Sequence, residues 1–217
     1  MAARRHQGLH CDRVRFGQAL FVTRPEMWLC RHGETEWSRG RRHTSHTDLP
    51  LTADGLDEAR RLAPRLAGVD FDLVLTSPMR RAADTAALAG FPEAIRDPVA
   101  SEWDYGDYEG RTTAAIREEV PGWTVWTHPL PGGETADQVA ARADRLIERV
   151  DRGAPTRALL FSHAHLLRVL AARWIGLPAS DGVRLLLDTG GVSVLGWERE
   201  VRAIQRWNLT GDATDRP

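Results

Sequence analysis

The chain has 217 residues, and all 29 of its basic side chains are arginine, against 30 acidic side chains and a net charge of -1. The absence of lysine excludes a phosphate-binding loop ending in Gly-Lys-Ser/Thr and excludes any lysine Schiff base. The near-neutral charge and the lack of an apolar run near 18 residues lead us to expect neither nucleic acid nor a membrane as a partner. Cys11 and Cys30 do not make a disulfide scaffold. We expect Cys30 to be a buried, inert thiol and the cytoplasm to be the compartment.

Residues 1–26 differ from the rest because they hold five arginines and only one short apolar stretch, at 19–22. That stretch is too weak for a secretory signal. We expect an N-terminal extension that is disordered or precedes a true start at Met27, with an edge strand at 19–23 as the alternative. One domain is expected over 27–210, followed by a tail at 211–217.

Short apolar runs alternate with helical patterns after residue 26, which is typical of an α/β layer fold. The expected strands are 27–30, 71–76, 94–96, 158–161, and a C-terminal pair near 192–197 and 201–207. The expected helices follow the N-cap Thr52 and cover 79–89, about 112–119, 134–151 and 166–175. We therefore predict a three-layer α/β/α sandwich with a mostly parallel central sheet and a C-terminal antiparallel hairpin.

Apolar spacing also predicts which helix faces point inward. After Thr52 the predicted inward residues are Leu56, Ala59, Ala63 and Leu66. In the helix 134–151 they are Val139, Ala143, Leu146, Ile147 and Val150. Residues 100–133 are rich in proline and glycine, which indicates a lid or a substrate-binding segment.

Histidine or arginine follows three of the predicted strands directly. Arg31-His32-Gly33-Glu34-Thr35 follows the first strand, Ser77-Pro78-Met79-Arg80-Arg81 follows the second, and Ser162-His163 follows the fourth. Ligands of open α/β sheets bind beyond the carboxyl ends of the strands. The pattern therefore predicts an anion pocket at this edge of the sheet.

With these segments the sequence resembles the histidine phosphatase superfamily, which includes cofactor-dependent phosphoglycerate mutases and many sugar-phosphate phosphatases. The resemblance covers roughly residues 27 to 208. It rests on the pentapeptide at 31–35, on the stretch Ser77 to Ala86, which selects Arg81, on Glu102 to Gly110, and on His163. It implies a phosphoric monoester hydrolase that needs no metal and no cofactor and that acts on a small-molecule phosphomonoester, with a homodimer left open.

The resemblance also implies the roles of five catalytic residues. His32 attacks phosphorus and carries the phosphoryl group, while Arg31 and Arg81 hold phosphate oxygens and His163 donates a further bond. The positive charges around His32 should lower its pKa and keep it nucleophilic. Glu102 relays the proton. The full predicted substrate-binding set is Arg31, Ser38, Thr44, Arg81, Glu102, Tyr105, Trp126 and Ala164.

Several neighbouring residues compete for these roles. Arg80 competes with Arg81, and Glu109 competes with Glu102. His163 and His165 would share one face of a strand and could bind a metal, but the strand is expected to end before His165. We expect His43, His46 and His128 to be loop residues near the mouth of the pocket.

Three positions depart from the family pattern. Ala164 stands where glycine is usual and would be strained if that position needs positive φ. Ser38 replaces an asparagine, and its hydroxyl can still bond phosphate. Ser45 replaces a glycine.

The alternatives are a mutase and a phospholigand sensor without turnover. Mutases of this family carry a long insertion before the Gly-Gly-Glu segment, with an arginine pair; here the interval from Gly110 to Gly132 is short and contains Trp123 and Trp126. This favours a phosphatase. The segments 102–110 and 186–198 resemble sedoheptulose bisphosphatase-like sugar phosphatases, and Trp126 is a candidate for stacking on a sugar.

Overall fold

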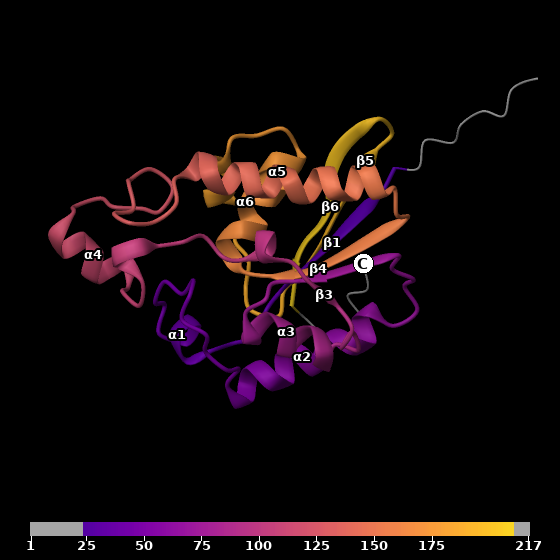
Figure 1. Ribbon diagram of the computed structural model, residues 1–217, viewed down its shortest axis with the longest axis horizontal. Helices are drawn as coiled ribbons and strands as arrows, with labels where there is room; N and C mark the ends of the chain where they lie inside the picture. The colour runs from indigo at the N-terminus through magenta and orange to yellow at the C-terminus, as the bar shows by residue number, and fades with distance from the viewer. Residues whose placement is uncertain (1–23, 211–217) are drawn as a thin grey trace, which may run out of the picture.

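The computed structural model describes residues 24–210, and a six-stranded sheet lies at its centre between two layers of helices (Figure 1). The strand order is β3-β2-β4-β1-β5-β6. The four strands β3, β2, β4 and β1 are parallel to their neighbours. β5 is antiparallel to β1 and forms an antiparallel hairpin with β6. The strands are β1 (Glu26–Arg31), β2 (Leu73–Thr76), β3 (Ile95–Arg96), β4 (Arg157–Ser162), β5 (Val192–Glu198) and β6 (Val201–Leu209). The predicted sandwich, with its mostly parallel sheet and C-terminal hairpin, is confirmed.

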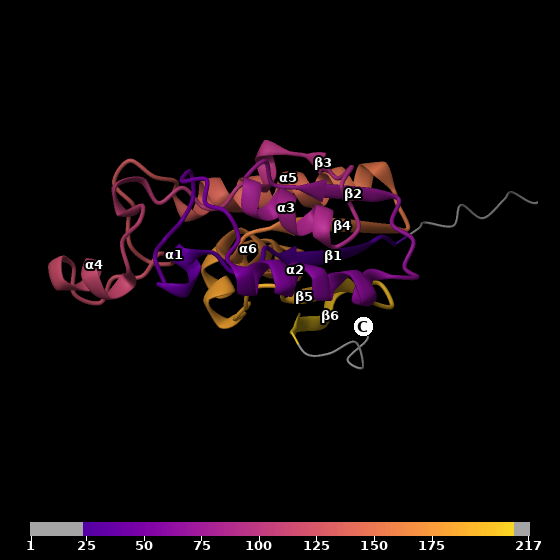
Figure 2. The same cartoon turned by 90° about the horizontal axis from the view of Figure 1, so that it is seen from below.

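Helices cover both faces of the sheet. The pair α2 (Ala53–Leu66) and α3 (Arg80–Leu88) lies on one face, and the pair α5 (Ala136–Gly153) and α6 (Ala164–Trp174) lies on the other (Figures 1 and 2). The short helices α1 (Glu36–Arg39) and α4 (Thr113–Glu119) project from the end of the molecule toward which β1 runs. Three 3₁₀ turns complete the path: η1 (Pro98–Ala100), η2 (Gly106–Tyr108) and η3 (Ala179–Arg184).

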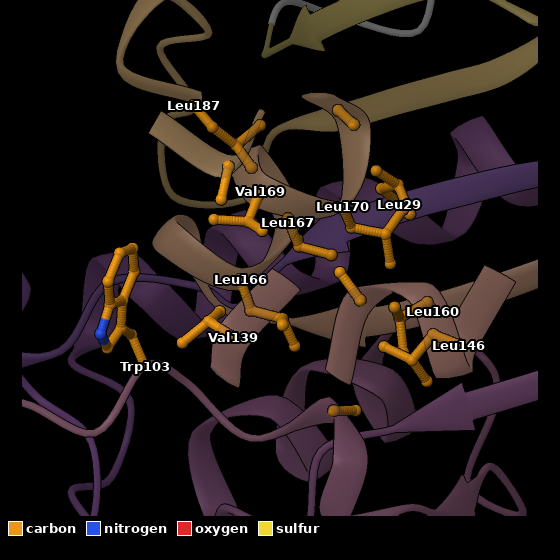
Figure 3. Packing of buried hydrophobic residues seen from close by; sticks show 14 of the residues in the cluster. Leu29, Trp103, Val139, Leu146, Leu160, Leu166, Leu167, Val169, Leu170 and Leu187 are labelled. Atoms are coloured by element: carbon orange, nitrogen blue, oxygen red, sulfur yellow. The ribbon is translucent and has the colours of Figure 1, made fainter. Parts of the chain in front are cut away.

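The alternation of β1 explains the two cores. Met27 and Leu29 pack into the core shared with α5 and α6, whereas Trp28 and Cys30 pack toward α2 and α3. Figure 3 shows the larger core, in which leucines from the helices meet leucines from the strands. Cys30 is buried as predicted, and burial raises the pKa of its thiol, which keeps it protonated and unreactive.

The helix faces follow the prediction in α5 and depart from it in α2. All five residues predicted to point inward from α5 are buried. In α2 the N-cap Thr52 is confirmed, but Leu56 and Ala63 are only half-buried, and Gly55 and Leu62 are buried instead. The stripe is rotated because Gly55 packs against backbone: a Cβ there would lie 2.1 Å from the carbonyl oxygen of Glu34.

The segment 100–133 is loop-rich as expected, with only η2 and α4 inside it after the end of η1. Its three tryptophans, at 103, 123 and 126, are buried in the larger core. Across residues 24–210 the structure has no helix with the length and apolarity to span a bilayer. The strand considered at 19–23 and the tail at 211–217 lie outside the described residues.

Candidate active site

Two adjacent central strands bring His32 and His163 together. β1 and β4 pair in parallel with Arg31 opposite Ser162, and the backbone N–H of His32 donates to the Ser162 carbonyl at 2.9 Å. The next residue of each strand is therefore a histidine, and the two ring centroids are 5.1 Å apart. As predicted, the residues that follow these two strands meet at the same edge of the sheet.

His32 is held as a neutral ring, and one of its nitrogens has no hydrogen-bond partner in the described part of the chain. Its Nδ1 lies 2.7 Å from the carbonyl oxygen of Gly33, and because a carbonyl only accepts, Nδ1 carries the proton. Nε2 then keeps its lone pair. Burial, followed by the charges of Arg81 and Arg31, lowers the pKa of His32 well below its usual value. The arrangement leaves Nε2 as a nucleophile.

Gly33 lets the motif lie directly against two helices. A Cβ at this position would lie 2.3 Å from the carbonyl oxygen of Gly55 in α2, and the Gly33 N–H donates to Oγ1 of Thr85 in α3 at 3.1 Å. The backbone after His32 is thus fixed from both sides.

Arg31 keeps donors for an anion. Its Nη1 donates to the Leu187 carbonyl at 2.6 Å, but its Nε is buried and has no hydrogen-bond partner among the described residues. Buried donors without partners are rare in folded proteins because losing water without a replacement bond is costly. Arg31 lines the cavity, and the other N–H groups on its Nη atoms have no hydrogen-bond partner among the described residues, so these can donate to a phosphate oxygen there.

Arg81 is fully buried and mostly engaged by the protein itself. Four of its five N–H groups have partners: Nε donates to His163 Nδ1, and the Nη atoms donate to the carbonyls of Thr44, Ser45 and Thr47. One N–H on Nη1 remains for a ligand. Arg81 therefore ties down the loop 44–47 as well as standing behind the two histidines, and its contact with phosphate stays a prediction.

His163 has no free ring nitrogen in this structure. Since Arg81 Nε can only donate, Nδ1 of His163 accepts, and its Nε2 then donates to Oγ of Ser77 at 2.8 Å. Burial and the charge of Arg81 lower its pKa well below the usual value, so the ring is neutral. Its predicted hydrogen bond to phosphate would require the bond to Ser77 to be exchanged.

Glu102 caps helix α6. The N-cap residue, His163, makes no side-chain cap bond, and the Glu102 carboxylate accepts instead from the N–H groups of His165 (3.1 Å) and Leu166 (2.8 Å). A third bond comes from the N–H of Trp103 at 2.9 Å. These bonds fix the carboxylate at the wall of the cavity that holds His32.

A cavity of about 440 Å³ lies at these strand ends. Seven predicted residues line it: Arg31, His32, Ser38, Thr44, Glu102, Tyr105 and Ala164. Arg81 and His163 lie behind this lining. A larger cavity of about 680 Å³ lies between the start of β1 and the β5–β6 hairpin, but no histidine of residues 24–210 lines it.

The structure places all three departures from the family pattern. The Ser38 hydroxyl accepts from the Thr35 N–H at 2.8 Å and donates to the Thr35 carbonyl, so it caps α1. Ala164 is the first residue of α6 and does not have positive φ, so alanine carries no strain there. The Ser45 hydroxyl donates to Glu109 at 2.7 Å.

Trp126 lies outside the lining of the cavity. Its ring packs against His165, with centroids 5.1 Å apart, and the Arg168 guanidinium lies over its ring at 4.6 Å. A sugar in the cavity would meet these neighbours before the indole. Its role in specificity stays a prediction.

The residues that compete for the predicted roles, Arg80 and Glu109, do not line the cavity. Arg80 is exposed and pairs with Asp84, and Glu109 accepts bonds from Ser45 and Thr47 rather than lining the cavity. β4 ends at Ser162, so the two histidines at 163 and 165 do not share a strand face. Within residues 24–210 no three His, Cys, Asp or Glu side chains are grouped so as to hold a metal ion.

The other histidines differ in position. His43 lines the cavity, and burial lowers its pKa to about 4. His46 is exposed and pairs with Asp104, whereas His128 bonds to Thr124 and Thr127 away from the cavity lining.

Sequence reasoning missed two walls of the cavity. His165 and Arg168 of α6 line it. Helical spacing could have revealed Arg168, which lies four residues after the predicted Ala164 and so shares its helix face. Residues 186–189 line it as well. They precede the antiparallel strand β5, so the start of that strand, and not its end, reaches the same edge of the sheet.

Comparison with known proteins agrees with this geometry. Residues 27–210 match the family model described as the histidine phosphatase superfamily, branch 1. The chain belongs to the histidine phosphatase superfamily. The resemblance seen in the sequence and the prediction of a histidine phosphatase enzyme are confirmed.

Individual relatives of this histidine phosphatase carry phosphatase names. It is 42% identical over 194 residues to an acid phosphatase of Mycobacterium tuberculosis, covering 88% of this chain and 95% of the relative. It is 33% identical over 186 residues to sedoheptulose 1,7-bisphosphatase of Saccharomyces cerevisiae, covering 70% and 68%. The solved structure of a Mycobacterium tuberculosis open reading frame product has a TM-score of 0.82 at 39% identity, covering 85% of this chain and 97% of that one.

Proposed function

We propose that this histidine phosphatase hydrolyses small phosphorylated metabolites, sugar phosphates above all, through a phosphohistidine at His32 and without a metal ion. The observation that carries the proposal is the state of His32: its Nδ1–H donates to the Gly33 carbonyl, and its Nε2, which has no hydrogen-bond partner among the described residues, lies in a cavity that Arg31 and Glu102 also line. We further propose a cytoplasmic location and a single catalytic domain over 27–210.

The proposed reaction has two steps. In the first, His32 Nε2 attacks phosphorus, the P–O bond to the organic group breaks, and Glu102 gives its proton to the leaving oxygen. In the second, Glu102 takes a proton from water, whose oxygen attacks the phosphohistidine and releases inorganic phosphate and His32. Arg31 and Arg81 stabilise the charge on the transferring group, each by roughly 10²–10³ in rate where a donor is well placed.

The substrate class rests on the size of the cavity and on the relatives. A volume of about 440 Å³ suits a small organic phosphate. The relatives include enzymes named for a sugar bisphosphate and for α-ribazole phosphate. The short stretch between Gly110 and Gly132 favours hydrolysis over the mutase reaction, because it leaves no room for a long insertion that would bind the substrate carboxylate.

Turnover of p-nitrophenyl phosphate with and without EDTA tests the reaction class. We expect hydrolysis that EDTA does not reduce, and ³²P-labelled substrate should label the wild type covalently. His32→Ala should lose activity and labelling while its circular dichroism is unchanged, and His46→Ala, which changes an exposed histidine, should keep both. Full activity of His32→Ala would show that His32 is not the nucleophile. Lack of turnover by folded protein would favour a phospholigand sensor, and exchange between 2- and 3-phosphoglycerate faster than phosphate release would favour a mutase.

A further inference from the structure

His165 stands next to the proposed proton relay without taking part in it. It occupies the first turn of α6, its backbone N–H donates to Glu102 Oε2 at 3.1 Å, and its side chain lines the cavity. His165 and Glu102 therefore line the same cavity as neighbours.

Four aromatic rings hold the imidazole of His165. The centroids of Trp126, Tyr105, His43 and Trp103 lie 5.1, 5.8, 6.1 and 6.4 Å from its own. Rings packed from several directions restrict the rotation of a side chain, so the two nitrogens of His165 have fixed directions.

Tyr105 decides which nitrogen carries the proton. Its hydroxyl lies 2.6 Å from His165 Nδ1 and has no other hydrogen-bond partner among residues 24–210. Burial lowers the pKa of His165 well below its usual value and raises that of Tyr105, so both groups are neutral. A neutral imidazole has one donor and one acceptor. Among the described residues Nδ1 is the one acceptor for the phenol proton, so the geometry favours Nδ1 as the acceptor and Nε2 as the nitrogen that carries the hydrogen.

The Nε2–H of His165 is open to the cavity. In the described part of the chain Nε2 has no hydrogen-bond partner, and it is not one of the two buried side-chain atoms that lack one, so it is accessible. Since the ring lines the cavity, that access is to the space in which a substrate would lie.

We propose that His165 is a specificity-determining residue whose Nε2–H donates a hydrogen bond to an oxygen on the organic part of the substrate, and that Tyr105 is the positioning residue that fixes this tautomer. The inference rests on the proposed hydrolase function and deepens it. Because the backbone of the same residue holds Glu102, the recognised oxygen lies near the phosphate ester. The substrate class is therefore a phosphorylated polyol or sugar, and alkyl phosphates lack the group that His165 reads.

A matched pair of substrates tests the donor. Erythritol 4-phosphate and n-butyl phosphate share a four-carbon chain and differ in the hydroxyl groups, so the ratio of their kcat/KM values isolates recognition of oxygen. We expect wild type to prefer the polyol, and His165→Phe to reduce that preference about tenfold, the value of one hydrogen bond. His165→Gln, which keeps a donor, should restore part of it, and His46→Phe should leave it unchanged. If His165 had a purely structural role, its replacement would lower kcat/KM for both substrates alike. A preference that stays within twofold of wild type in His165→Phe would therefore overturn the proposal.

The tautomer itself can be read by ¹⁵N NMR of the imidazole nitrogens, with His165→Phe identifying the resonances. We expect the Nε2–H form in wild type and a mixture of tautomers in Tyr105→Phe, together with a smaller polyol preference; a wild-type Nδ1–H form would refute the assignment. If p-nitrophenyl phosphate is not hydrolysed, the hydrolase proposal fails separately. The two four-carbon phosphates are then compared by calorimetric binding, where the same tenfold change in ratio is expected.

Discussion

Removing the Glu102 carboxylate should destabilise the protein as well as inactivate it. Active-site residues are commonly neutral or even unfavourable for stability, so their removal often costs nothing. Here the carboxylate is the acceptor for three backbone N–H groups, two of them in the first turn of α6, and is only 6% exposed. Loss of an N-cap acceptor costs about 0.5–2 kcal/mol, and loss of hydrogen bonds to a charged group adds to this. Water entering from the cavity recovers part of it, so we expect Glu102→Ala to lose about 2 kcal/mol.

Urea unfolding followed by circular dichroism measures this loss. Glu102→Gln keeps one acceptor oxygen but turns an amide NH₂ toward backbone donors, so it should lose about 1 kcal/mol. Glu148→Ala is the matched control, because Glu148 on α5 is exposed and, among residues 24–210, pairs only with Arg152, an interaction that contributes about 0.3–0.5 kcal/mol. Glu102→Ala with a free energy of unfolding equal to or above that of wild type would refute the capping role.

Two more predictions concern His32 and its surroundings. Gly33→Ala should lower kcat/KM of p-nitrophenyl phosphate by at least about 10² and destabilise by about 1–3 kcal/mol, because its Cβ would lie 2.3 Å from backbone oxygen. Gly153→Ala should do neither, because its Cβ would meet the Pro155 side chain at an ordinary van der Waals distance of 3.6 Å. Stability should also fall as the pH is lowered from 7 to 5: burial depresses the pKa values of His32, His163 and His165, so below about pH 6.5 the unfolded chain binds protons that the folded chain refuses. The slope is at most about 1.4 kcal/mol per pH unit for each histidine, and urea midpoints that do not change over this range would contradict it.

The fold could be predicted from the sequence wherever the spacing of apolar residues agrees with the packing that the structure shows. The apolar residues of β1 are buried on both faces, and the helical spacing in α5 predicted its five inward residues without error. The strand ends then placed His32 and His163 together, because neighbouring parallel strands end at the same edge of the sheet.

What the sequence could not provide are contacts between distant segments. The inward face of α2 is rotated because Gly55 meets the backbone of Glu34. The hydroxyl of Ser38 is spent on a cap, and the donors of Arg81 are spent on the carbonyls of the loop 44–47. None of these bonds follows from residue type or spacing, because each depends on which loop the fold places opposite.

The parts of the site differ in how much free energy their local opening costs, and the pairing of Arg31 with Ser162 belongs to the part that opens least easily. His32 and His163 follow the two middle strands of the six, whose residues are buried on both faces, so their separation is lost only when the sheet itself separates. The wall at 186–189 is a loop with the side chain of Leu186 largely exposed, and such segments open with far smaller free energies. Under mild denaturant or heat the molecule therefore loses the fit of its substrate wall first. We expect selectivity between phosphate esters to decrease under conditions in which His32 and His163 still keep their relative positions.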